Sequence, residues 1–297
     1  MQSKRLGWIF LAPTLVILFF FGVVPFFYVV WVSFHSWNPF AVNPDMIFNG
    51  ADNFRQIVFD QAFLNSVGVT VLFVIFAVSS ELVIGYFLAQ AFMKDFPGKA
   101  IFRTIHTLPL IMAPIIVGSV WKLMTTPSIG IIPHSLDEWF GITMNIGTSV
   151  PAAFATIVIM DIWHWTPLVT LTLVTLTLIA ALVSLPPDPF EQAQIDGAGK
   201  RQMFWHITLP MIAPAIVATV FIRLMDALRT VDEVWMLTGG GPGSSTRFVG
   251  VHIFKEVFPK TNYGYGSTIS VIVLYLTIVT CWLLYVTMLA PRNKRED

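Results

Sequence analysis

A few ionisable residues lie in very apolar sequence. Asp161 and His164 are three residues apart and Trp165 comes next, so a helix would place all three close to one face. Arg223 and Asp226 have the same spacing. Ionisable residues within or at the ends of the apolar runs include Glu81, Asp161, His164, Arg223, Asp226 and Arg229. Such groups are costly inside a membrane. They could be structural ion pairs between helices, or they could line a polar translocation path.

Motifs for covalent, metal or nucleotide chemistry are missing from the sequence. It contains no HExxH, GxSxG or Walker-type phosphate loop, and its single cysteine is Cys281. An intramembrane enzyme built on Asp161 and His164 would lack a nucleophile or a metal partner. We therefore expect no catalytic residue, no metal ligand and no cofactor in this chain, so ATP, if used, would bind elsewhere. A formal net charge of zero also indicates no nucleic-acid partner.

The elements that must position these residues are long apolar helices. The chain is 56% hydrophobic and 11% charged, whereas soluble domains carry about 25% charged residues. Apolar runs of this length predict transmembrane helices in a lipid bilayer. We expect an all-α membrane protein whose six helices cover residues 7–32, 67–92, 101–124, 152–180, 206–229 and 267–290.

Basic residues indicate how these helices are oriented. Ten lysines and arginines lie at the two termini and in or at the edges of the second-to-third and fourth-to-fifth connections, against five in or at the edges of the other connections. Because positively charged segments stay on the cytoplasmic side, we expect both termini and the loop at about 186–210 to be cytoplasmic. The outer loops would then be 33–66, 125–151 and 230–266.

The loop between the fourth and fifth spans carries helix-capping signals. In "SLPPDPFEQAQIDGAG" (184–199), Asp188 can act as N-cap and Glu191 falls at the third helical position. Gly197 and Gly199 can end the short helix. Taken alone, caps and glycines would suit an ordinary helix–turn–helix connection.

As a combined pattern, this loop resembles the EAA loop of ABC-importer permeases. The resemblance implies that the loop docks on a separate ATPase and transmits its movement to the membrane helices. Glu191 would then meet a basic residue of the ATPase, and Gly197 would form a turn that no side chain could fit. Gln192 departs from the usual alanine. The matching residues are Glu191, Ala193, Asp196, Gly197, Ala198, Ile207, Leu209 and Pro210.

Other stretches resemble the carbohydrate, maltose-type branch of these permeases. They are "LAPTLVILFFFGVVPFFYVVWVSFHSW" (11–37), "NFRQIVFDQAFLNS" (53–66) and "DEVWMLTGGGP" (232–242). The resemblance implies a type I ABC importer permease, with a first helix and outer loop in 1–66 and a core domain in 67–297. It further implies an ABC ATPase dimer that binds ATP and Mg, a second permease subunit, an extracytoplasmic solute-binding protein, and a bacterial or archaeal cytoplasmic membrane.

The cargo implied by this branch is a sugar, oligosaccharide, polyol or glycerol-phosphate type of solute. Sugars stack their apolar C–H faces on aromatic rings and need polar neighbours for their hydroxyls, although Trp163 and Trp165 would also suit interfacial anchors. We hypothesise a solute path bordered by Asp161, Trp163, His164, Trp165, Asp226 and Asp232. The alternative is an ion-gradient-driven secondary transporter or channel that uses Glu81 and Asp161, although the sequence shows no matching halves.

Overall fold

The computed structural model describes residues 2–183, 192–193 and 195–288. The chain divides into two compact units. One contains the residues up to Asn65 together with His252–Ile278, and the other contains Ser66–Val251 together with the residues from Val279. Residues 252–278 therefore pack with the N-terminal segment.

The first unit begins with a long apolar helical segment and a very short antiparallel hairpin, in which His35 pairs with Phe48. Residues Phe10–Val32 form a candidate membrane span, in which an 18-residue window has a mean hydropathy of 2.6. The elements of this unit, in chain order, are α1 (Gln2–Leu18), the π-helical turn η1 (Phe19–Val23), α2 (Val24–Val32), β1 (His35–Ser36), β2 (Ile47–Phe48) and α3 (Asp52–Val58), followed by parts of α4, α13 and α14.

Close contacts join the segment just after α2, residues 33–37, to the start of α14 (Tyr263–Met288) within this unit. A Cβ atom added at Gly264 would lie 2.1 Å from the carbonyl oxygen of His35, so only glycine fits there. The Gly264 N–H donates to the Trp37 carbonyl at 3.2 Å. The Thr268 hydroxyl donates to the Ser33 carbonyl at 2.9 Å. Small residues at the start of α14 therefore let two backbones approach closely.

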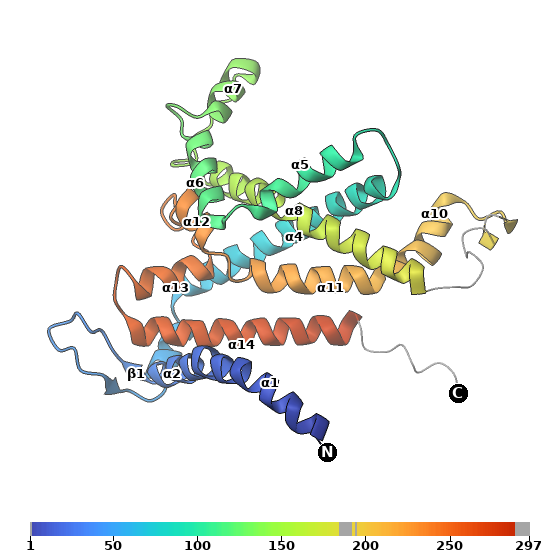
Figure 1. Cartoon of the computed structure of the whole chain (residues 1–297). Helices are drawn as coiled ribbons and strands as arrows, with labels where there is room; N and C mark the ends of the chain where they lie inside the picture. Colours follow the sequence, from blue (N-terminus) through green and yellow to red (C-terminus); the bar gives the residue numbers. More distant parts are fainter. Residues whose placement is uncertain (1, 184–191, 194, 289–297) are drawn as a thin grey trace. The chain divides into compact units, whose positions relative to one another are not determined.

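The second unit is a bundle in which α8 packs against α5 and α11 (Figure 1). Its core includes the fully buried Phe73, Ile157 and Met160. The elements are α4 (Gln61–Met93), α5 (Lys99–Ile111), α6 (Pro114–Thr125), α7 (Ile131–Phe140), α8 (Val150–Val183), α10 (Lys200–Met203), the π-helical turn η2 (Phe204–Thr208), α11 (Leu209–Ala227) and α12 (Asp232–Leu237), with the first residues of α13 (Val249–Val257) and the end of α14.

Five described helices are long and apolar enough to cross a membrane, and the expected third span is broken. The span expected over 101–124 consists of two helices, because α5 and α6 meet at an angle of 100°. Met112 and Ala113 adopt extended backbone conformations with ψ of 139° and 137°. Pro114 explains part of this break, since a proline disfavours the helical conformation of the residue before it.

Helix α12 lies beside α6 (Figure 1). At Gly118 the two helices are so close that no side chain fits between them. A Cβ atom added there would lie 2.6 Å from the Glu233 carbonyl oxygen and 2.9 Å from Cβ of Met236. This contact fixes the backbone of α12, and therefore the position of Glu233, relative to the first half of α6.

We expect Gly118→Ala to lower the free energy of unfolding by about 1–3 kcal/mol, the usual effect of overpacking. The matched control is Gly68→Ala in α4, where an added Cβ meets no heavy atom within 4 Å. This control should be neutral or stabilising, because alanine favours helices by about 1 kcal/mol over glycine. Thermal unfolding of the purified protein in detergent would measure both variants. Equal stability of Gly118→Ala and wild type would contradict the close contact.

Candidate functional site

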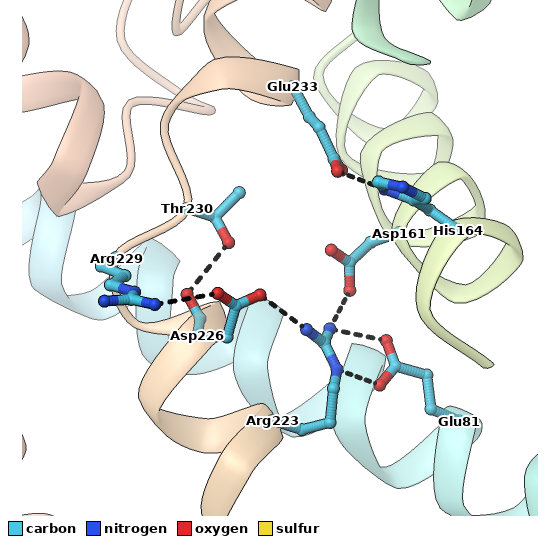
Figure 2. Close-up of polar contacts among 8 residues, drawn as sticks. All are labelled: Glu81, Asp161, His164, Arg223, Asp226, Arg229, Thr230 and Glu233. Carbon is cyan, nitrogen blue, oxygen red and sulfur yellow. Dashed lines mark hydrogen bonds and ion pairs between the residues drawn. The ribbon is translucent and has the colours of Figure 1, made fainter. Parts of the chain in front are cut away.

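The centre of the site is Arg223 of α11, whose side chain is fully buried. Its Nε donates to Oε2 of Glu81 on α4 at 2.6 Å, and its Nη2 donates to Oε1 of the same carboxylate at 2.8 Å (Figure 2). Nη2 also donates to Asp161 on α8 at 2.8 Å, and Nη1 donates to Asp226 at 3.1 Å. One guanidinium therefore joins three helices, as the structural ion-pair interpretation anticipated.

A second buried pair, His164 and Glu233, joins α8 to α12. Nδ1 of His164 lies 2.5 Å from Oε1 of Glu233 (Figure 2). Its Nε2 lies 3.2 Å from the carbonyl oxygen of Met112. Because both ring nitrogens face oxygen acceptors, the pair is either an imidazolium with a carboxylate or an imidazole with a protonated carboxyl. Both forms carry no net charge.

His164 also explains how the break between α5 and α6 is accommodated. The last carbonyl groups of a helix have no intrahelical partner, and a buried one needs another donor. His164 supplies that donor to Met112, next to the break. Burial raises the pKa of the Glu233 carboxyl, and the hydrogen bond to His164 only partly offsets this. Sequence reasoning missed Glu233, although it directly follows Asp232 in the quoted string.

A cavity of about 320 Å³ lies next to these pairs, where α6, α8 and the segment after α11 meet. The guanidinium carbon of Arg223 lies 4.9 Å from the ring centroid of Trp165, within cation–π range. The wall therefore combines an oriented indole with carboxylates. The residues that line the cavity are Pro114, Trp165, Asp226, Arg229, Thr230, Val231, Asp232 and Glu233.

The structure separates the six residues expected to border a solute path. Trp165, Asp226 and Asp232 lie on the cavity wall. The side chains of Asp161 and His164 are only 1% exposed and are engaged by Arg223 and Glu233. Trp163 does not line this cavity, and its ring centroid lies 6.1 Å from that of Trp121. Sequence spacing placed Asp161, His164 and Trp165 on one face, but it could not show that two of them would be buried by other helices.

The loop expected to bind an ATPase is described in part, and Glu191 lies outside the described residues. The Ala198 N–H donates to the Ala193 carbonyl at 2.8 Å, and the Asp196 N–H donates to the Gln192 carbonyl at 3.0 Å. Gly197 has a φ of +75°, yet a Cβ added there would meet nothing within 4 Å. Within this chain, glycine is therefore favoured at this turn by its backbone conformation and not by crowding.

The second half of the expected motif continues into the fifth span. Ile207 lies in η2, and Leu209 and Pro210 begin α11. Residues Arg201–Ala227 form one candidate span, so the helix that follows Gly199 is continuous with a membrane helix. A displacement applied to the loop would therefore act directly on the helix that carries Arg223.

Several curated proteins are similar to this chain over most of its length. A trehalose/maltose transport system permease protein, MalF, of Thermococcus litoralis is 33% identical over 93% of this chain and 91% of that protein. A multiple sugar-binding transport system permease protein, MsmF, of Streptococcus mutans is 27% identical over 92% of each chain. The trehalose transport system permease protein SugA of Mycobacterium tuberculosis is 29% identical over 92% of this chain and 85% of that protein.

A solved structure has the same fold. One chain of a bacterial ABC transporter involved in the import of the acidic polysaccharide alginate aligns with a TM-score of 0.80 and 18% identity, covering 98% of both chains. Residues 81–295 match the family described as the binding-protein-dependent transport system inner membrane component. That region contains Glu81, Arg223, the cavity and the loop around Gly197. The chain is therefore a multi-pass membrane protein that belongs to the family of binding-protein-dependent transport system inner membrane components.

Proposed function

We propose that this chain is the permease subunit of an ATP-driven, binding-protein-dependent importer of a carbohydrate-type solute. The family supports the dependence on a binding protein. Relatives whose names refer to trehalose, maltose and multiple-sugar transport support the class of cargo. The single observation that carries the proposal is the cavity beside Trp165, which pairs an aromatic face with hydrogen-bond acceptors. Sugars present apolar C–H faces and hydroxyl donors, which match both features.

In this proposal the chain binds no cofactor and catalyses no reaction. ATP and Mg are bound by an ABC ATPase dimer, which contacts the loop around Gly197 on the cytoplasmic side, where both termini also lie. A second, related permease completes the path across the cytoplasmic (inner) membrane, and an extracytoplasmic binding protein delivers the solute. The continuity of the loop with α11 supports this route for coupling, because α11 carries Arg223 and ends beside the cavity.

The test is co-expression of this chain with its ATPase, partner permease and binding protein, followed by reconstitution into proteoliposomes. We expect ATPase activity to rise with one or more members of a carbohydrate panel, and uptake to require ATP. Uptake by this chain alone, driven by a proton gradient without ATP, would instead support a secondary transporter. Glu81 and Asp161 are less suited to that role, because Arg223 binds both carboxylates.

Trp165→Ala should reduce the affinity of the transporter for its sugar by roughly tenfold, since aromatic contacts add about 0.5–1.5 kcal/mol beyond the buried apolar area. The half-maximal solute concentration for uptake would measure this. The control is Trp139→Ala in α7, whose side chain is exposed and does not line the cavity. Unchanged uptake and ATPase stimulation in Trp165→Ala would remove this residue from the solute path.

A further inference from the structure

The cavity beside Trp165 has an acidic wall. Its charged lining residues are Asp226, Arg229, Asp232 and Glu233. The cation in this set, Arg229, pairs with Asp226 at 3.5 Å, and its side chain is 78% exposed to solvent. Arg229 can therefore offset the charge of Asp226 but leaves Asp232 unbalanced. Among the described residues, no ion pair of Asp232 is found.

The charged groups behind this wall do not neutralise its negative charge. The His164–Glu233 pair carries no net charge in either of its proton arrangements. Arg223 is shared by Glu81, Asp161 and Asp226 (Figure 2). The acidic set is Glu81, Asp161, Asp226 and Asp232, and the basic set is Arg223 and Arg229. Because Arg223 is fully buried and already engaged by Glu81, Asp161 and Asp226, it does not pair with Asp232 on the wall.

The wall also offers an acceptor for a ligand that can donate hydrogen bonds. Glu233 is 2% exposed, lines the cavity, and has no hydrogen-bond partner for its Oε2 atom among the described residues. A buried acceptor without a partner is destabilising, and a solute hydroxyl could supply the missing donor. A phosphate or carboxylate group could not, because its ionised oxygens only accept hydrogen bonds.

We propose that this cavity selects against anionic saccharides, so that the cargo is a neutral saccharide and not one bearing phosphate or uronate groups. This inference rests on the proposed function and narrows its substrate class. Repulsion between like charges is stronger in a cavity with low-dielectric walls than in water. The fold does not determine this property, since a chain of the same fold belongs to a transporter involved in the import of an acidic polysaccharide.

The test measures saccharide binding to the assembled permease–ATPase complex in lipid nanodiscs, with the binding protein omitted so that its own selectivity does not contribute. The probes are two matched pairs of labelled sugars, maltose with maltose 1-phosphate and trehalose with trehalose 6-phosphate. Equilibrium dialysis measures the binding of each sugar. At low ionic strength we expect the neutral member to bind at least tenfold more tightly. Raising the salt concentration should reduce this difference, because salt screens exposed charges.

Variants then assign the selectivity to the wall. Asp232→Asn removes an unpaired charge and Asp232→Lys reverses it, so both should weaken the preference for the neutral sugar, the second by about tenfold. Glu233→Gln serves as an additional variant but also alters the contact with His164. The matched control is Glu138→Gln in α7, whose carboxylate is 65% exposed and lies outside the cavity. The control should retain the wild-type preference.

Three outcomes would be unfavourable, and they differ in what they reject. Equal or tighter binding of the phosphorylated sugars would overturn the charge inference while leaving a carbohydrate permease in place. A neutral preference that survives Asp232→Lys would show that this wall is not its origin. Binding of no saccharide, combined with a lack of ATPase stimulation by the whole carbohydrate panel, would reject the proposed function itself.

Discussion

Arg223→Met is expected to lower the free energy of unfolding by about 3–5 kcal/mol, because removing one partner of a buried ion pair leaves uncompensated charge. The loss should be large here because the Arg223 side chain is fully buried and holds Glu81 and Asp161 at once. Thermal unfolding in detergent or nanodiscs, monitored by size-exclusion chromatography, would measure the effect.

The matched control is Arg55→Met in α3. Arg55 also pairs with an aspartate, Asp52 at 3.5 Å, but its side chain is 80% exposed. Exposed ion pairs contribute only about 0–1 kcal/mol, so this variant should unfold close to wild type. Equal destabilisation by the two substitutions would contradict a special role for the buried network.

A compensated variant separates lost charge balance from lost packing. In Arg223→Met combined with Glu81→Gln and Asp161→Asn, no unpaired carboxylate remains at the centre of the cluster. We expect this triple variant to recover a large part of the stability lost in the single variant, since neutral replacements of buried ion pairs are often tolerated. If it were no more stable than Arg223→Met, the damage would come from packing and not from unpaired charge.

Gly197→Trp is expected to reduce transport and solute-stimulated ATPase activity by at least tenfold while the membrane bundle unfolds at its normal temperature. The turn requires a φ of +75°, which is disfavoured for residues with a side chain by roughly 1–2 kcal/mol. The substituted position is exposed, so the bulk of the indole would meet an external partner and not this chain. ATPase assays and uptake in the reconstituted transporter would measure the loss.

Alanine substitutions at two nearby glycines separate backbone strain from bulk. Gly199 does not have a positive φ, and a Cβ added there would meet only Oε1 of Gln202 at 3.8 Å. Gly199→Ala should therefore be tolerated, whereas Gly197→Ala should show an intermediate loss of coupling. Normal ATPase binding and transport in Gly197→Trp would argue strongly against the coupling role of this loop.

The two expected results differ in how far the sequence supports them. Gly197 was identified from a local string of residues, and its positive φ follows from the same few residues in the structure. Arg223 was identified only as an ionisable residue in an apolar run. Its main partner, Glu81, lies 142 positions away in the chain, so no local pattern could have paired them.

What the sequence determined by itself is the class of protein and most of its helices. Apolar runs specify spans through local composition, and five of the six expected runs correspond to long apolar helices. The family resemblance was likewise readable from contiguous residues, and it is confirmed by the match over residues 81–295. These properties need no knowledge of which helices become neighbours.

Only the tertiary structure decided how the site is built. In it, the third span is interrupted at Met112 and Ala113, and His164 is buried between that interruption and Glu233. Trp165 lies on the cavity wall. Each of these results depends on which faces of distant helices meet, because burial and ion pairing are set by neighbours in space. Helical periodicity places residues on a common face, and the partners packed against that face determine which of them a solute could reach.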